Sequence, residues 1–300
     1  MSEISIDYLN SKFSLGRYLS FRDGPNGLIY AHINNDSGSA EIYLHGAHVI
    51  SFVPHGREPV IFLSDKSRYE PGKAIRGGIP ISWPWFADHP SDSTKPAHGF
   101  ARTMLWEVRD TQHISTDETE ITLALNESEE THKLWDYSFN LELRICVGAE
   151  LNVILTMANC GDESFAVTSA FHSYYNVRNI DDVTIYGLED TEYIDKVDNF
   201  KTKQQTGPLI ITGETDRIYV NTETECIIED LDLNRKIRIS KSGSGSTVVW
   251  NPWGKKAHNM SDLPDDGYRN FVCVETTNAG MDIITLAPGE QHKLCLEIAV

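Results

Sequence analysis

Residues 139–147 alternate between apolar and polar side chains with a period of two. The apolar positions are Phe139, Leu141, Leu143, Ile145 and Val147, and Asn140, Glu142, Arg144 and Cys146 stand between them. Because successive side chains of a β-strand point to opposite faces, this pattern predicts a long strand with one buried face. A second run at 151–159 follows after Gly148-Ala149-Glu150, so the two runs predict a β-hairpin.

Similar short runs recur along most of the chain, separated by turn signals such as residues 23–27, 242–246 and 288–290. They lie at 28–34, 40–44, 48–53, 106–110, 120–125, 165–171, 225–230, 236–240, 248–250, 271–275 and 292–298. Short, evenly spaced strands favour an all-β fold, either a large antiparallel β-sandwich or a closed, barrel-like sheet. One short helix is predicted, at 127–135. No repeat or linker divides the chain, so residues 1–300 are expected to form a single domain.

Two long stretches, 64–98 and 252–270, show no strand pattern and are rich in Trp, Pro, His and Lys. Long irregular segments inside a compact domain usually carry function, because a regular scaffold positions them at the surface. We therefore expect the functional residues to gather around these two stretches.

The net charge of −18 disfavours nucleic acids and anionic membranes as partners, because both are bound mainly through an excess of Lys and Arg. No apolar run approaches the roughly 18 residues of a membrane-spanning helix, and residues 1–10 show no basic and apolar leader pattern. The five cysteines are odd in number and widely spaced, which is typical of reduced thiols. Together these features predict a cytoplasmic protein.

Two arginines stand in unusual surroundings. Arg76 is followed by Gly77-Gly78-Ile79-Pro80, and Arg102 ends the motif AHGFAR at residues 97–102. An unpaired guanidinium among apolar, constrained residues is costly. A planar fork of donors suits phosphate or carboxylate, so the two arginines predict a site for an anion held between them.

Aromatic residues follow Arg76 in the run Trp83-Pro84-Trp85-Phe86. Because a pyranose presents apolar C–H faces, an aromatic ring beside an arginine suits a sugar, and Trp85 is predicted to contact it. In the alternative interpretation, Trp83 and Trp85 fill the end of the sandwich. His98 stands in a Gly-Phe turn, either as a binding residue or bonded structurally to a backbone carbonyl.

His172 and Glu275 each stand near the end of an apolar run. His172 precedes Ser173-Tyr174-Tyr175-Asn176, so its ring lies either in the core or in a water-poor site that fixes its tautomer. Desolvation would raise the pKa of a buried Glu275 and suit a general base, whereas a salt bridge to an arginine would lower that pKa. His45 and His48 lack a helix to align them, so no metal site is predicted there.

Seven stretches, taken together, resemble the aldose 1-epimerase (mutarotase) superfamily, and within it the branch of hexose-6-phosphate mutarotases, or glucose-6-phosphate 1-epimerases. They are IRGGIPISWPWF at 75–86, PAHGFAR at 96–102, LWE at 105–107, FHSYYN at 171–176, GLEDTEYID at 187–195, WNPW at 250–253 and VCVE at 272–275. They occur in the order of the family. The family fold is a large antiparallel β-sandwich, the galactose mutarotase-like supersandwich, which agrees with the alternation above.

The resemblance implies a role for several residues of this chain. His172 would be the general acid and Glu275 the general base. The residues implied to bind substrate are Arg76, His98, Arg102 and Asp195, with Arg76 and Arg102 holding a phosphate. The partner would be a small-molecule sugar phosphate, with no metal or other cofactor, and the family permits a monomer. Ala97 stands where some relatives carry Gln, which bears on fine specificity.

The reaction implied is the interconversion of the α and β anomers of a hexose 6-phosphate. Glu275 takes the proton of the anomeric hydroxyl and protonated His172 donates to the ring oxygen, so that the C1–O5 bond breaks. Rotation about C1–C2 and reclosure give the other anomer. A further hypothesis is that the segment 252–270 closes over the phosphate through Lys255 and Lys256.

Three alternatives stay open at this point. One is a non-catalytic sugar-binding or sugar-sensing protein on the same fold. Another is a mutarotase for unphosphorylated aldoses, which the two arginines disfavour. A third is a metal-dependent sugar isomerase, for which the sequence lacks a clustered His/Glu ligand set. A chelator would distinguish the last, because the expected mutarotase should be indifferent to it.

Overall fold

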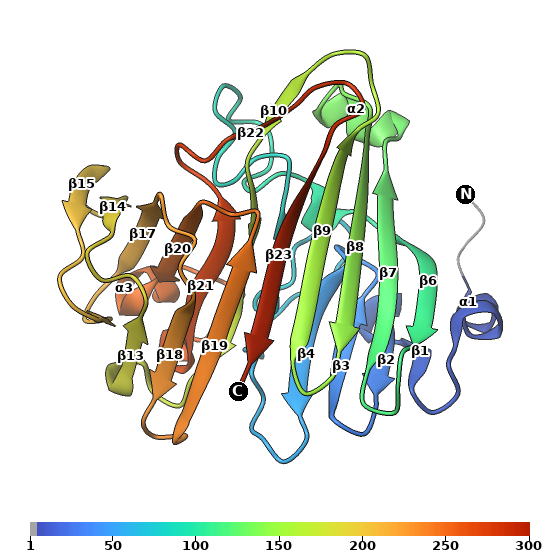
Figure 1. The fold of residues 1–300 in the computed structure, drawn as a ribbon, viewed down its shortest axis with the longest axis horizontal. Helices are drawn as coiled ribbons and strands as arrows, with labels where there is room; N and C mark the ends of the chain where they lie inside the picture. The colour runs from blue at the N-terminus through green and yellow to red at the C-terminus, as the bar shows by residue number, and fades with distance from the viewer. Residues whose placement is uncertain (1–4) are drawn as a thin grey trace.

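The computed structural model describes residues 5–300. The first four residues of the N-terminal stretch 1–10, for which the sequence predicted no leader pattern, lie outside the described residues. Nine strands form the largest sheet. In spatial order they are β16 (Leu209–Ile210), β13 (Val183–Tyr186), β18 (Cys226–Asp230), β19 (Arg235–Ser242), β23 (Gln291–Ala299), β9 (Leu151–Asn159), β8 (Phe139–Val147), β7 (Thr119–Asn126) and β6 (Glu107–His113). This sheet forms one layer of the molecule (Figure 1).

Two further sheets form the layer behind it. The first contains β1 (Leu19–Asp23), β2 (Ile29–Asn34), β3 (Gly38–Tyr43) and β4 (His48–Pro54). The second runs β15 (Lys201–Gln204), β14 (Glu192–Asp195), β17 (Thr215–Val220), β20 (Ser246–Asn251), β21 (Phe271–Asn278), β11 (Ser169–Phe171) and β5 (Ile81–Ser82), with β12 (Tyr174–Asn176) also paired to β21. The contacts of β3 with β8 and of β21 with β23 join the layers. Every ladder between these strands is antiparallel, which confirms the predicted sandwich.

The predicted hairpin is present and explains how the layers pack. β8 pairs with β9 with Val147 opposite Leu151, and the apolar positions of β8 are buried while Glu142 and Arg144 are exposed. The buried face of β8 contributes Phe139, which packs against the indole of Trp83 with ring centroids 4.6 Å apart. Alternation along one strand thus fixes which face meets the second layer.

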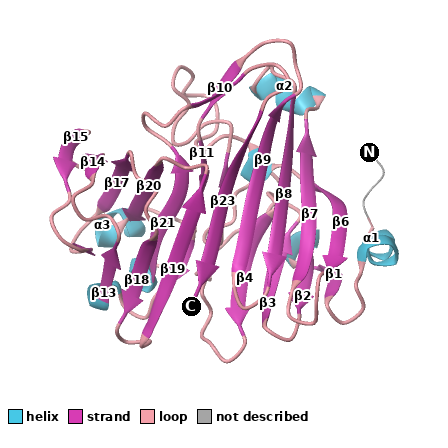
Figure 2. Cartoon of the chain, in the orientation of Figure 1, coloured by secondary structure: helices cyan, strands magenta, loops and turns pink. Residues whose placement is uncertain are grey.

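Helices are few and peripheral (Figure 2). The predicted helix is confirmed as α2 (Glu129–Leu134). A capping box formed by Ser128 and Thr131 stabilises its N-terminus. α1 (Ile6–Phe13), which the sequence reading did not identify, buries Leu9 and Phe13 against β1 and β6. No helix among residues 5–300 is long and apolar enough to cross a membrane.

Two predicted segments differ from the structure. The run at 165–171 is not one strand, because it divides at Thr168 into β10 (Phe165–Val167), which pairs with β22 (Ile284–Leu286), and β11, which joins another sheet. The stretch 252–270 is not wholly irregular, since it contains α3 (Trp253–His258). The first difference arises because the two halves of the run pair with strands of different sheets, which local alternation does not reveal.

Strand β21 links the fold to its site. All eight of its residues are buried. Val274 belongs to the main core, whereas Glu275 and its neighbour on β20, Val248, line a cavity on the opposite face of the sheet. Arg76 and Lys256, from the two long stretches, also line this cavity.

Candidate active site

A cavity of about 350 Å³ lies on this face of the eight-stranded sheet. Its lining residues come from loops and strand ends far apart in the sequence: Arg76, Phe86, Ala87, Asp88, Ala97, His98, Arg102, His172, Lys196, Asp216, Val248, Trp250, Lys256 and Glu275. Five residues of the sequence prediction therefore lie together here, namely Arg76, His98, Arg102, His172 and Glu275. Larger hollows exist elsewhere on the surface, but this one contains the buried titratable groups.

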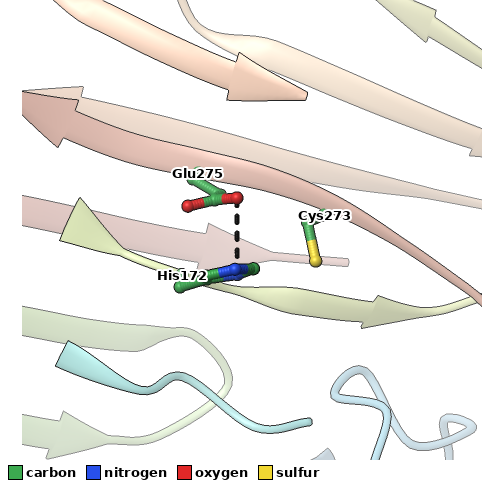
Figure 3. Close-up of side chains that lie close together, drawn as sticks. All are labelled: His172, Cys273 and Glu275. Carbon is green, nitrogen blue, oxygen red and sulfur yellow. Dashed lines mark ion pairs between the residues drawn. The ribbon is translucent and has the colours of Figure 1, made fainter. Parts of the chain in front are cut away.

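His172 and Glu275 face each other across neighbouring strands. Nδ1 of His172 lies 3.3 Å from Oε1 of Glu275, and both side chains are buried (Figure 3). His172 follows β11, and its backbone N–H donates to the carbonyl of Pro80. Its ring stacks on Tyr174, 4.9 Å away and nearly parallel. The ring is therefore held rigidly against the carboxyl group.

Burial shifts the two groups in opposite directions. Burial, followed by the charges of Arg102 and Arg76, lowers the pKa of His172 well below 6.5. Burial, followed by the charge of Asp216, raises the pKa of Glu275 well above 4.5. Burial therefore favours the uncharged form of both groups, a protonated carboxyl beside a neutral imidazole, so the pair contains one acid and one base 3.3 Å apart. The alternative interpretation, a salt bridge between Glu275 and an arginine, is not found among the described residues, where the ion pair of Glu275 is with His172.

His98 presents a defined ring nitrogen to the cavity. The backbone N–H of Ala87 donates to its Nδ1, and Oγ of Ser82 lies 3.1 Å from the same atom. Because Nδ1 accepts, Nε2 carries the proton and is free to donate to a ligand. His98 has a positive φ of 62°, a conformation that costs a non-glycine residue about 1–3 kcal/mol. The alternative of a ring bonded only to a backbone carbonyl is wrong.

The two arginines differ in how many of their guanidinium hydrogen-bond donors already have a partner within the protein. Arg76 Nη2 lies 3.0 Å from Oδ2 of Asp262, and Nη1 donates to the hydroxyl of Tyr174 at 3.0 Å. The protein itself therefore supplies partners for Arg76, one of them the carboxylate of Asp262. Asp262 comes from the second long stretch, and its partnership could not be read from sequence neighbours.

Arg102 keeps most of its hydrogen-bonding capacity. Its Nη2 donates to the carbonyl of Ala97 at 2.8 Å, the single hydrogen bond of its side chain within residues 5–300. Burial, and the nearby charge of Arg76, lower the pKa of Arg102. A guanidinium with free donors beside a second cation is a strong site for an anion.

Glycine is required where the Arg76 loop passes the first layer. A Cβ at Gly78, whose φ is 71°, would collide with the ring of His48 and the carbonyl of Val49. The ring of His48 lies 2.8 Å from the carbonyl of Gly77 and so fixes the loop. His48 is thus a structural residue, consistent with the absence of a predicted metal site at His45 and His48.

The structure places Asp195 and Trp85 away from the cavity lining defined by residues 5–300. Asp195 accepts from Lys203 at 2.8 Å and from the backbone N–H groups of Val197 and Asp198, so it organises the turn after β14. Trp85 is 5% exposed and its indole N–H donates to the carbonyl of Pro96. For Trp85, the alternative of a core-filling residue fits the geometry better.

Sequence reasoning missed residues that line the cavity instead. Lys196 follows Asp195 in the turn, and its Nζ lies 2.9 Å from Oδ2 of Asp216. Trp250 meets the edge of the His172 ring at a centroid distance of 5.7 Å. For Trp250 the available sequence signal was the WNPW motif, and for Lys196 it was a polar residue directly after the end of β14. Neither signal says which side chain faces the cavity.

Of the two neighbouring lysines in the second long stretch, Lys255 and Lys256, Lys256 alone lines the cavity within residues 5–300. Lys256 lines the cavity and lies 3.1 Å from Oε1 of Glu214, whereas Lys255 is exposed and is not among the lining residues within the described chain. The stretch is also anchored, because its Asp262 pairs with Arg76 and its backbone carbonyl accepts from Ser64. Lys256 therefore already lies at the rim.

Comparison with known proteins places this geometry in a family. The sequence profile of aldose 1-epimerase matches residues 30–299. A relative from Escherichia coli K12, provisionally named glucose-6-phosphate 1-epimerase, is 38% identical over 82% of this chain and 82% of its own length. A plant relative with the same provisional name, from Cenchrus ciliaris, is 36% identical over 85% of this chain and 79% of its own.

Solved structures agree with the sequence matches. A Salmonella typhimurium protein provisionally described as a mutarotase is 34% identical, with a TM-score of 0.89 over 96% of this chain and 95% of that chain. A galactose mutarotase-like protein from Lactobacillus casei is 20% identical, with a TM-score of 0.72 over 90% of this chain and 99% of that chain. The second likeness shows the fold alone, and it agrees with the predicted supersandwich.

Proposed function

The chain belongs to the aldose 1-epimerase family, and from this premise we propose that it interconverts the α and β anomers of glucose 6-phosphate. The observation that carries the proposal is the combination in one cavity of a buried carboxyl–imidazole pair with two arginines. The pair suits proton transfer to and from the two oxygens of an anomeric centre, and the arginines suit a phosphate. The relatives' names point to the same substrate.

In the proposed reaction Glu275 removes the proton from the anomeric hydroxyl while His172 protonates the ring oxygen. The C1–O5 bond breaks, its electron pair goes to O5, and an open-chain aldehyde forms. After rotation about C1–C2, the O5 hydroxyl attacks the other face of the carbonyl with the proton transfers reversed. Each positioned acid or base contributes about 10²–10⁴ in rate.

For Glu275 to act as the base and His172 as the acid, the proton must move from Glu275 to His172, and substrate binding favours this transfer. In the free site the proton is favoured on Glu275. Burial raises the pKa of Glu275, whereas burial, followed by the charges of Arg102 and Arg76, lowers the pKa of His172. A phosphate dianion bound by Arg76 and Arg102 offsets their positive charge. The pKa of His172 then rises, and the proton moves to His172 and leaves Glu275 as the base.

Further lining residues have roles in the same proposal. His98 donates through Nε2 to a sugar hydroxyl, and Asp216, held by Lys196, accepts from another. Trp250 offers an apolar face beside His172. We do not assign a substrate contact to Asp195 or Trp85, whose side chains are engaged elsewhere. All these groups come from one chain, so the proposed site is complete in a monomer.

Magnetisation-exchange NMR of α- and β-glucose 6-phosphate tests the proposal. We expect catalytic amounts of protein to accelerate exchange between the anomers, and His172→Ala to remove the acceleration. Unphosphorylated glucose should exchange much more slowly at the same protein concentration. Line broadening without accelerated exchange would contradict catalysis and indicate a sugar-sensing protein instead.

The ratio kcat/KM, which reports the ligand-free site, should show a bell-shaped dependence on pH, because the active pair carries one proton. Burial and the arginines lower the pKa of His172, so a second proton is taken up, and activity lost, only below pH 6.5. Burial and Asp216 raise the pKa of Glu275, so the single proton is lost only well above pH 4.5. The measurement is the exchange rate at substrate concentrations well below KM over a pH series. A rate that changes monotonically through neutrality would contradict the pairing.

Trp250 and Trp85 should respond differently to substitution. Trp250→Ala removes an aromatic face from the cavity, and we expect the KM for glucose 6-phosphate to rise about tenfold, equivalent to about 1.4 kcal/mol. Trp85→Phe should leave KM unchanged and lower thermal stability, because Trp85 packs against Phe100 and His89. Steady-state kinetics and thermal melts of both variants decide between them. A raised KM in Trp85→Phe would instead support the sequence prediction that Trp85 contacts the sugar.

A further inference from the structure

Cys273 completes a three-residue cluster with the acid–base pair. It stands two residues before Glu275 on β21, and side chains two apart on a strand share a face. A ring nitrogen of His172, Sγ of Cys273 and a carboxyl oxygen of Glu275 all lie within 4.8 Å of one another (Figure 3). The proposed reaction uses His172 and Glu275 but gives Cys273 no role.

Two of these side chains present buried polar atoms without a partner. Nδ1 of His172 and Oε2 of Glu275 make no hydrogen bond to any part of the chain that the structure describes. Both residues are more than nine-tenths buried. Orphaned polar atoms are uncommon in protein interiors, and an ion at the site is one way of satisfying them. Cys273 adds a free, fully buried thiol.

We propose that His172, Cys273 and Glu275 bind a zinc ion that inhibits the protein. One nitrogen, one sulfur and one oxygen ligand form a donor set that suits Zn²⁺, and two of the three residues, His172 and Glu275, line the cavity. Zinc bonds of 2.0–2.3 Å place neighbouring ligand atoms about 3.3–3.7 Å apart. The 3.3 Å separation of His172 and Glu275 already meets this requirement, and Cys273 needs a shift of at most about 1 Å.

Binding of the ion releases protons. Cys273 must lose its thiol proton, and the proton shared by His172 and Glu275 also leaves to water, so the cluster meets the ion as thiolate, neutral imidazole and carboxylate. Burial raises the pKa of Cys273 and of Glu275 well above their ordinary values, and the nearby charges of Arg76, Arg102 and Lys196 repel a dication, so both effects weaken binding. The ion is therefore a reversible inhibitor rather than a permanent constituent.

Inhibition follows because the ion occupies the two groups that the reaction needs. The metal-free protein is the active form, so a chelator should restore activity after zinc has removed it. Zinc should also compete with the sugar, since its ligands His172 and Glu275 are the groups that act on the anomeric centre. The inhibition rests on the proposed function, whereas the binding of the ion does not.

Cys273→Ala provides the decisive variant, with Cys226→Ala as its matched control. Cys226 is a buried thiol on β18 that lies outside the cavity lining. Wild type and Cys226→Ala should lose anomerase activity as ZnCl₂ is added, and EDTA should restore it. Cys273→Ala should keep its activity without zinc and require at least about tenfold more zinc for the same inhibition, since it lacks one ligand. Equal zinc sensitivity in Cys273→Ala would overturn the proposal.

A spectroscopic titration separates this inference from the proposed function. Added Co²⁺ should give a near-ultraviolet thiolate-to-cobalt absorption band at one ion per chain in wild type and Cys226→Ala. The band should be missing in Cys273→Ala and in Cys273→Ser, the second variant in case the first folds poorly. A band without anomerase activity would support the metal site while contradicting the proposed function. A wild-type spectrum without the band would overturn the metal site.

Discussion

Glu275→Gln is expected to lower the turnover number for anomer exchange of glucose 6-phosphate by about 10²–10⁴ while KM changes little. Glutamine has the shape of glutamate but cannot accept the proton of the anomeric hydroxyl. Magnetisation-exchange NMR of the variant at saturating substrate gives the rate directly.

The same substitution should not harm the fold. Burial raises the pKa of Glu275, so at neutral pH the carboxyl group opposes folding relative to its ordinary value in the unfolded chain. Removing the charge removes that opposition, and the unfolding free energy of the variant at pH 8 should equal or exceed that of the wild type. Glu142→Gln, at an exposed position of β8, is the matched control and should change neither rate nor stability. An active Glu275→Gln variant would eliminate Glu275 as the base.

Arg102→Met is expected to lower kcat/KM for glucose 6-phosphate by about 30- to 1000-fold, equivalent to about 2–4 kcal/mol. Its guanidinium donates one hydrogen bond within the described chain, to Ala97, so its remaining donors are available to a phosphate. Methionine preserves most of the buried volume. The measurement is the exchange rate over a range of substrate concentrations.

Unphosphorylated glucose is the internal control for this variant. A residue that binds only the phosphate should leave the slow exchange of glucose unchanged, whereas a structural residue would lower both rates together. Arg57→Met, at an exposed position, should leave both substrates unaffected. Arg102 is a cleaner probe than Arg76, because removing Arg76 also leaves Asp262 without its ion-pair partner.

The sequence by itself predicted many of the strands and singled out several residues that line the cavity, although it did not identify β1 or β13 to β17. Alternation in 139–147 is a property of neighbouring residues, so it predicted the strand, its buried face and its hairpin with β9. Charged residues that stand among apolar neighbours can also be recognised from the local sequence, because burying them is costly. His172 and Glu275, at the ends of apolar runs, and Arg102, among glycine and apolar residues, were found in this way and lie in one cavity.

Only the tertiary structure decided which of these groups face one another. The His172–Glu275 distance depends on β11 pairing with β21 in the register that sets Phe171 opposite Thr276. Asp195 and Lys196 are neighbours in sequence, yet one secures its own turn while the other reaches the cavity. Trp85 and Trp250 are equally aromatic, and the packing around each decided which is buried. Such choices depend on contacts between residues far apart in the chain, and local pattern carries no information about them.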